Sequence, residues 1–185
     1  MYSFNEYKKL TSKYGSVASW AIWDDEDLSN TSPIELNFNE LNSKFILLGL
    51  NISKPLMSKP WTNFHSGRHD RKLKYACNHS TLRGSYLTDI FKGIDNPNSA
   101  DFSKSLTIKD IRDNVDFFMQ EMIDVKINEE TQFIIFGNLT NQYFNKYFRQ
   151  NYKNNVIHFR HYSSRGTDKE WVTQFLEKVE YRSKL

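Results

Sequence analysis

Short, continuous apolar runs recur along the chain, separated by segments in which apolar residues repeat every three or four positions. The runs lie at residues 44–50, 84–91, 131–137 and 155–159. Apolar runs of this length, bounded by glycine and polar residues, are typical of strands that are buried on both faces of a parallel sheet. The pattern therefore predicts four parallel strands.

The periodic segments predict helices at residues 2–14, 68–78, 108–125, 139–149 and 168–180. In the third of these, Thr107 stands at the N-cap position and Asp110 follows three residues later, which is typical of a helix start. Its predicted inner face consists of Ile111, Val115, Phe118, Met119 and Met122. Strands alternating with helices predict an α/β fold: a three-layer α/β/α arrangement with a central four-stranded parallel sheet, forming a single domain over residues 1–185.

Three segments lack a clear period. Residues 17–23 are apolar and suit either a helix or a collapsed loop. Residues 24–43 are acidic and rich in asparagine, and residues 94–106 are polar, so we expect both to be connections without regular structure.

Composition narrows the class of protein. The sequence has one cysteine, Cys77, which excludes an internal disulfide and a cysteine-ligated zinc or iron–sulfur site. No segment approaches the roughly 18 apolar residues of a membrane span, and residues 1–14 are not followed by the apolar run of a secretory signal. These features predict a cytoplasmic protein with no membrane partner.

Positive charge is concentrated in one stretch, although the net charge is only +3. The stretch contains Lys54, Lys59, Arg68, Arg71, Lys72 and Lys74. Basic side chains of this density supply phosphate contacts in proteins that bind nucleic acid, but taken alone they more often form a solvated surface.

The loops after the predicted strands hold the candidate chemistry, because open parallel sheets bind ligands outside the carboxyl ends of their strands. The first strand leads into Asn51, and Phe64 follows in the same loop. The second strand carries Asp89, the third is followed by Asn138, and the fourth is followed by His161.

This order of features resembles the uracil-DNA glycosylase superfamily. The shared features are a Gly-x-Asn at the first edge, a Phe about fifteen residues on, a strand ending in Asn or Asp, a Phe-Gly-Asn and a His-x-Ser. They span residues 45–167, and it is their order and placement, rather than any single motif, that carry the resemblance. The resemblance implies a DNA glycosylase that acts on a flipped base in DNA, with neither a metal nor an organic cofactor.

The resemblance also implies a role for each matching residue. Asn51 corresponds to the residue that positions the attacking water, and His161 to the residue that hydrogen-bonds the departing base. Phe64 corresponds to the ring that stacks on the base, and Asp89 and Asn138 are expected to contact it. The expected DNA-binding residues are Lys54, Ser163, Ser164 and Arg165.

The chemistry of these residue types is consistent with such roles. A base inside a duplex must be unstacked before an enzyme can act on it, and an aromatic ring replaces about 1–3 kcal/mol of the lost stacking. A donor such as His161 stabilises the negative charge that develops on the base. Asn51 can orient a water molecule but cannot act as a base, because its amide does not take up a proton at neutral pH.

Asp89 departs from the asparagine that usually reads uracil in this family. An ionised carboxylate only accepts hydrogen bonds, so it would repel O4 of uracil, whereas it accepts from the amino group of cytosine or adenine. Three explanations stay open: the base carries an amino group, Asp89 is protonated in an apolar pocket, or the site has lost its activity.

Each residue alone also has an ordinary structural explanation. Asn51 suits a turn, Phe64 suits a core, and Asp89 suits a helix cap or an ion pair with Lys92. Three other functions therefore stay open for the chain: a module that binds a base without cleaving it, a hydrolase or transferase of small nucleotides, and a plain interaction protein.

Overall fold

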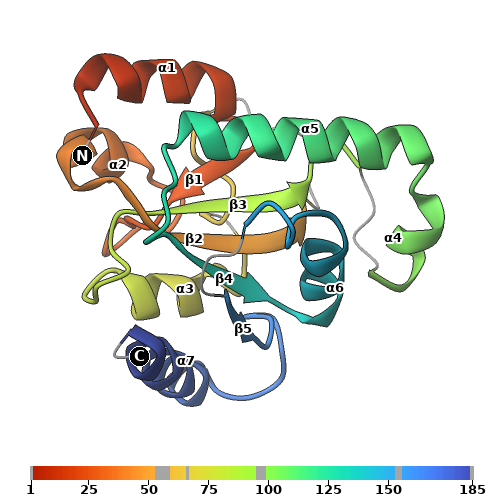
Figure 1. The fold of residues 1–185 in the computed structure, drawn as a ribbon. Helices are drawn as coiled ribbons and strands as arrows, with labels where there is room; N and C mark the ends of the chain where they lie inside the picture. Colours follow the sequence, from red (N-terminus) through yellow and green to blue (C-terminus); the bar gives the residue numbers. More distant parts are fainter. Residues whose placement is uncertain (1, 53–58, 66, 95–98, 153–155, 184–185) are drawn as a thin grey trace.

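One mixed sheet organises the computed structural model, and helices cover both of its faces (Figure 1). The structure describes residues 2–52, 59–65, 67–94, 99–152 and 156–183. The strands are β1 (Ala18–Trp20), β2 (Asn42–Asn51), β3 (Ser85–Phe91), β4 (Gln132–Phe136) and β5 (Val156–Phe159). The helices are α1 (Phe4–Tyr14), α2 (Ser32–Leu36), α3 (Asp70–Cys77), α4 (Ser99–Ser105), α5 (Ile108–Asp124), α6 (Asn138–Tyr147) and α7 (Asp168–Ser183), with a 3-10 turn, η1, at Phe38–Glu40.

The strand order is β1-β3-β2-β4-β5, and all neighbours are parallel except β1, which runs antiparallel to β3. The prediction of an α/β fold is confirmed, whereas the prediction of a purely parallel, four-stranded sheet is wrong. The missed strand lies in residues 17–23, where a helix or loop was expected. It is only three residues long and all three side chains are buried, so it has no alternating pattern to reveal it.

A second correction concerns residues 94–106, which were expected to be a polar loop but contain α4. Phe102 anchors this helix to the rest of the fold. Its side chain is fully buried, and the centroid of its ring lies 5.2 Å from that of the Phe91 ring. A single anchor in a polar sequence leaves no periodic signal for a helix. The short helix α2 is a similar addition within residues 24–43.

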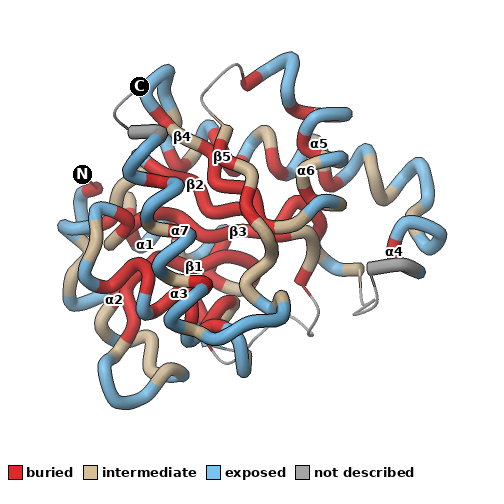
Figure 2. Tube along the Cα trace, turned by 90° about the horizontal axis from the view of Figure 1, so that it is seen from below, coloured by how far each residue is buried: buried red, intermediate tan, exposed pale blue. Residues whose placement is uncertain are grey.

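Two apolar cores lie on opposite faces of the sheet. Alternate residues of β2 point to opposite faces, as the pleat of a strand requires: Ile46 and Leu48 join the core beneath α1, α5 and α6, while Phe45 and Leu47 join the core beneath α3 and α7. Figure 2 shows the strands as mostly buried and the helices as alternately buried and exposed. The strands therefore read as continuous apolar runs because each face has its own helix layer.

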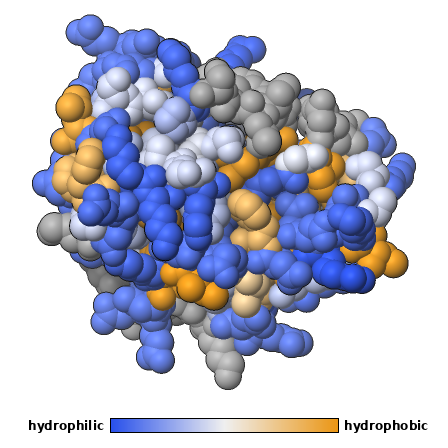
Figure 3. All heavy atoms as spheres, turned by 90° about the horizontal axis from the view of Figure 1, so that it is seen from above, coloured by the Kyte–Doolittle hydropathy of each residue, from blue (hydrophilic) through white to orange (hydrophobic). Residues whose placement is uncertain are grey.

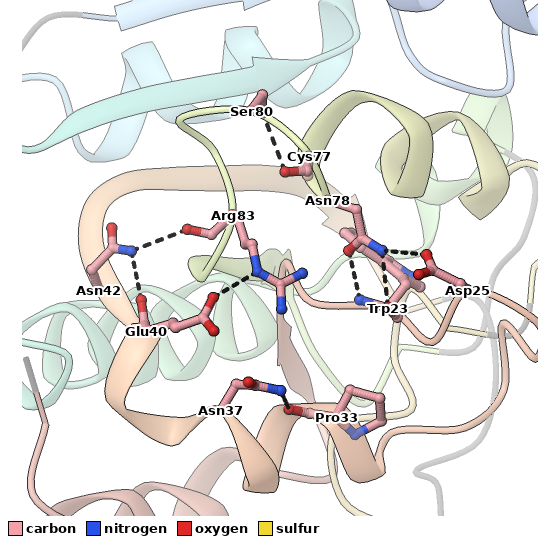
Figure 4. A network of polar contacts seen from close by, with 10 residues as sticks. All are labelled: Trp23, Asp25, Pro33, Asn37, Glu40, Asn42, Cys77, Asn78, Ser80 and Arg83. Atoms are coloured by element: carbon pink, nitrogen blue, oxygen red, sulfur yellow. Dashed lines mark hydrogen bonds and ion pairs between the residues drawn. The ribbon is translucent and has the colours of Figure 1, made fainter.

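Polar contacts at the amino ends of β2 and β3 hold these two strands together (Figure 4). The Asn42 side-chain amide donates to the carbonyl oxygens of Glu40, at 3.0 Å, and Arg83, at 3.2 Å. The Arg83 guanidinium in turn forms an ion pair with the Glu40 carboxylate at 2.6 Å. These contacts join the chain before β2 to the turn before β3, and so help to define how the two strands pair.

A buried ion pair lies under α5. Glu121 is fully buried, forms an ion pair with Lys92, and accepts hydrogen bonds from the hydroxyl groups of Tyr86 and Thr88, each at 2.8 Å. The capping box at Thr107 forms as predicted, and Phe118 and Met122 lie on the inner face of α5. Glu121 was not expected on this face, because its burial depends on three partners that come from β3 and its end.

The face formed by α1 and α5 is mostly hydrophilic, with separate apolar patches (Figure 3). Among the described residues, no helix is both long enough and apolar enough to cross a membrane.

Replacing Lys92 by methionine should destabilise the fold by about 3–5 kcal/mol, because it leaves the Glu121 carboxylate buried without a counter-ion. Urea denaturation of the single variant measures this loss. The double variant Lys92→Met/Glu121→Gln should recover most of it, since glutamine still accepts from Tyr86 and Thr88. A single variant that loses less than about 1 kcal/mol, as an exposed pair would, contradicts this account.

Candidate functional site

A cavity of about 520 Å³ opens at the carboxyl edge of the sheet. Its lining comes from the end of β2 (residues 50–51), Asp89 on β3, residues 136–140 between β4 and α6, residues 161–163 after β5, and residues 67–70 at the start of α3. The first four segments follow neighbouring parallel strands, and this is where open α/β sheets hold ligands.

Five of the residues predicted from the sequence meet in this cavity. They are Asn51, Asp89, Asn138, His161 and Ser163. Parallel pairing explains why they meet: Gly49 of β2 lies opposite Asp89 of β3, so the ends of the two strands are level. Asn51, Phe64, Asp89 and His161 were expected to converge on one pocket; Asn51, Asp89 and His161 do so, whereas Phe64 does not line the cavity.

His161 has a defined arrangement of protons. Its Nδ1 accepts a hydrogen bond from the backbone N–H of Ser163 at 3.1 Å and lies 2.7 Å from the Ser163 hydroxyl oxygen. A ring nitrogen that accepts from an N–H carries no proton, so in the neutral ring the proton is on Nε2. Burial, with a contribution from His69, lowers the pKa of His161 to about 4, so the ring is neutral at physiological pH. It is therefore a neutral N–H donor on the wall of the cavity.

Asp89 is a buried carboxyl group, with 4% of its surface exposed. Its Oδ2 accepts a hydrogen bond from the Asn63 side-chain amide at 2.9 Å. Gly49 provides the space for this side chain, since a Cβ at that position would lie 2.2 Å from Asp89 Oδ1. Burial raises the pKa of Asp89 to about 7, although the Asn63 hydrogen bond opposes the shift. Near neutral pH the group therefore exists both as an acid and as a carboxylate.

Phe64 does not line the cavity but lies directly behind it. It is buried in the core under α3 and α7, and its ring lies 6.4 Å from the Tyr162 ring, centroid to centroid. An ideal Cβ on Gly49 would be 3.6 Å from the tip of the Phe64 ring. Tyr162 and Phe136, whose ring centroids lie 5.6 Å apart, are aromatic residues that line the cavity in its place; neither was among the predicted site residues.

The loop that carries Asn63 and Phe64 is held by the N-terminal part of the chain. Asn78, at the end of α3, fixes the Trp23 backbone with two hydrogen bonds of 2.9 Å (Figure 4), and the Trp23 indole N–H donates to the Phe64 carbonyl oxygen at 3.1 Å. Asn63 also donates to the Val17 carbonyl oxygen at 3.2 Å. Phe64 has a φ of 67°, a left-handed backbone that a non-glycine residue adopts only under constraint.

Asn51 and Asn138 occupy adjacent strand ends. The Asn51 side-chain amide donates to the Ile94 carbonyl oxygen at 3.3 Å. Asn138 is the first residue of α6, and its side chain is exposed. Gly137 before it has a φ of 91° and lies against His161, since a Cβ on Gly137 would be 3.6 Å from the His161 Cβ.

The other expected DNA-binding residues are placed differently. Lys54 lies outside the described residues. Ser164 does not line the cavity; its carbonyl oxygen accepts from the Lys72 amine at 3.1 Å, and its hydroxyl is buried without a partner among the described residues. Arg165 is exposed, and its carbonyl oxygen accepts from Arg160 at 3.2 Å.

The basic stretch does not form a continuous solvated surface. Arg71 forms an ion pair with Asp168 at 2.8 Å, while Lys72 and Lys74 are buried against backbone carbonyl oxygens. Arg68 is the member of the stretch that lines the cavity, with an exposed side chain that forms no ion pair with the described residues. Arg71, Lys72 and Lys74 therefore contribute to the fold, while Lys59 and Arg68 are exposed.

Asn63 and Asp70 were not predicted as part of the site. Asp70 begins α3, lines the cavity, and accepts from the Gly67 backbone N–H at 2.6 Å. Asn63 lies in the loop after β2, beside Phe64, but twelve residues beyond the strand end, and Asp70 begins α3, so neither stands directly at a strand end. No sequence signal for either residue is visible in the single sequence.

No family model matches the chain, and no curated protein matches it.

Asp89→Asn should remove a pH dependence from the stability of the protein. The pKa is about 7 in the fold and ~4 in the unfolded chain, so the folded state holds the extra proton between these values and the free energy of unfolding falls as pH rises from about 4 to about 7. Above about pH 7 Asp89 is ionised in the folded state as well, and the full destabilisation caused by its buried charge is present. Asparagine keeps the hydrogen bond from Asn63 but does not titrate. The free energy of unfolding of the variant, relative to that of wild type, should therefore rise by roughly 1–4 kcal/mol between pH 5 and pH 8. Urea titrations at both values measure this, with the exposed Asp116→Asn as control; equal slopes for wild type and Asp89→Asn would disprove the assignment.

Gly49→Ala should destabilise the protein by about 1–3 kcal/mol, because its Cβ overlaps the Asp89 carboxyl. The double variant Gly49→Ala/Asp89→Ala should be less unstable than the sum of the two single changes, since the clash disappears. Thermal unfolding of wild type, the two single variants and the double variant gives the interaction energy between the two residues. Additive effects would mean that the two residues are not in contact.

Proposed function

We infer that this chain is a DNA glycosylase of the uracil-DNA glycosylase type, which hydrolyses the bond between deoxyribose and a base flipped out of the DNA. The observation that carries the proposal is the neutral His161 donor, which shares one cavity with Asn51 and Asp89. The three-layer arrangement of such glycosylases is compatible with helices on both faces of the sheet, although β1 adds an antiparallel edge strand.

The cavity suits a small ring with polar edges. Its volume of about 520 Å³ lies within the range of pockets that bury small ligands. Tyr162 supplies an aromatic wall, backed by Phe64, and Asp89 supplies a polar group able to contact the edge of a base. A flipped base needs this combination, because it loses both its stacking and its pairing partners.

The proposed reaction uses each residue for what its chemistry allows. When the glycosidic bond breaks, the electron pair moves to the base, and the Nε2–H of His161 stabilises the resulting negative charge. A well-placed donor of this kind contributes ~3 kcal/mol to the transition state. Asn51 orients the water molecule that adds to the sugar, and Asn138 stands beside it at the next strand end. The water then gives up a proton to the departed base anion, so the products are a sugar with a new hydroxyl group and a neutral base.

Contacts with DNA are assigned to the rim of the cavity. Arg68 and Ser163 line the cavity with exposed side chains, and Arg165 is exposed in the same loop as Ser163. A guanidinium and a hydroxyl group are suitable partners for phosphate oxygens. This limited set of cations predicts weak binding to undamaged DNA, with only a shallow dependence on salt concentration, because few phosphates are neutralised.

Base release from oligonucleotides, measured by mass spectrometry, tests the proposal. His161→Ala should slow release about 10²–10³-fold by removing the donor, and Asn51→Ala should also lower it. His79→Ala is the matched control, because His79 is exposed and does not line the cavity. DNA binding without base release would instead indicate a binding module, and release only from free nucleosides would indicate a small-nucleotide hydrolase.

A further inference from the structure

Asp89 lies in the cavity without a counter-ion. Among the described residues it forms no ion pair, and Lys92, whose positive charge acts on it, is already paired with Glu121. The other groups facing it are Asp70 from α3, a second acidic side chain, and Tyr162, an uncharged phenol. Burial is the main reason that the neutral acid is favoured over the carboxylate; Glu121 and Asp70 add to this effect, while the Asn63 hydrogen bond and Lys92 oppose it.

The surroundings also orient the carboxyl group. The Asn63 amide donates to Oδ2, which marks this oxygen as the acceptor of the neutral acid and favours the proton on Oδ1. Oδ1 packs against the Gly49 backbone and fills the space that a side chain would take there, which fixes the position of the carboxyl group. Asn63 is itself fixed by Val17, so the acid presents one donor and one acceptor with a defined polarity.

We propose that Asp89 both recognises the base and acts as the general acid of the reaction, and that the base carries an exocyclic amino group beside an unprotonated ring nitrogen, as cytosine and adenine do. This inference rests on the proposed glycosylase function. Asn63 is the positioning residue that holds the acid in its reactive orientation.

The pattern of donors and acceptors favours this class of base. The neutral acid accepts a hydrogen bond from the amino group and donates its O–H to the ring nitrogen, while the carboxylate still accepts from the amino group. A base with a carbonyl at that position, such as uracil, is tolerated only by the neutral acid and is repelled by the carboxylate. A residue that occurs in both forms near neutral pH therefore suits an amino-bearing base better.

The leaving-group chemistry favours the same class. An amino group donates electrons into the ring, so a base that carries one is a poor leaving group when it departs as an anion. Transfer of the Asp89 proton to the ring nitrogen lets the base depart as a neutral molecule. The glycosidic bond breaks with its electron pair on the base, Asp89 becomes a carboxylate, and water adds to the sugar carbon. The proton lost by that water restores the Asp89 acid, so atoms and charges balance.

The experiment compares base release from matched oligonucleotides that contain cytosine, 5-methylcytosine, adenine, uracil or hypoxanthine. The first three arms identify which amino-bearing base is the substrate. For that base, kcat/KM should be level below pH 7 and fall about tenfold per pH unit above it, as the acid form disappears. Asp89→Asn should reduce this release about 10²–10⁴-fold, because an amide cannot transfer a proton.

Asn63→Ala, together with Asp89→Asn, separates a loss of catalysis from a loss of folded structure. Asn63→Ala removes a hydrogen bond that stabilises the carboxylate, so it should raise the pKa of Asp89 and move the fall in kcat/KM to higher pH. A merely structural role for Asn63 would lower the rate without moving the profile. Asp89→Asn should retain release of uracil or hypoxanthine, because its amide matches their N–H and carbonyl, and this shows that the variant is folded. His79→Ala should leave every profile unchanged.

The possible failures are distinguishable. Release of uracil or hypoxanthine without release of any amino-bearing base would overturn this inference and leave the glycosylase function standing. Undiminished release of an amino-bearing base by Asp89→Asn would overturn the general-acid role. No release from any oligonucleotide would overturn the glycosylase function, and the role of Asp89 in catalysis with it.

Discussion

The pairing of β2 with β3 is the constraint on which the candidate site depends. It places Gly49 opposite Asp89, and the missing side chain of one residue is the space that the carboxyl group of the other occupies. A shift of one residue in this register would turn Asp89 to the other face of the sheet. This register runs from Ile46, opposite Tyr86, to Asn51, opposite Phe91, and is separated by a register shift from the pairing of Asn42 with Ser85.

Two buried carboxyl groups, those of Glu121 and Asp89, have different electrostatic surroundings. Glu121 is surrounded by Lys92 and two hydroxyl donors, so its negative charge is matched. Asp89 is also buried, but among the described residues its carboxyl group accepts one hydrogen bond, from Asn63, and forms no ion pair, so its negative charge is less well compensated. A fully compensated pair is typical of structural support, whereas an uncompensated group in a cavity is the kind of group that exchanges protons near neutral pH.

The N-terminal part of the chain contributes to the site without entering it. Residues 15–23 hold the loop that carries Asn63 and Phe64 through contacts of Val17, Ser19 and Trp23. This loop has left-handed backbone at Trp61 and Phe64, a conformation that persists only where surrounding contacts impose it. The edge strand β1 is thus part of the support for the Asp89 side chain, which Asn63 reaches from this loop.

The sequence by itself determined the α/β class, the strands β2 to β5, the longer helices and the residues at strand ends. These features follow from local patterns, because apolar runs, helical periods and capping residues each involve residues that are close together in the sequence. The convergence of Asn51, Asp89, Asn138 and His161 also followed, because parallel strands bring their carboxyl ends to one edge. Only the tertiary structure decided the antiparallel strand β1, the helix α4, the burial of Glu121 and the partnership of Asn63 with Asp89. Each of these depends on contacts between residues distant in the sequence, and the protonation state of Asp89 depends first on how deeply the fold buries it and then on the groups placed beside it.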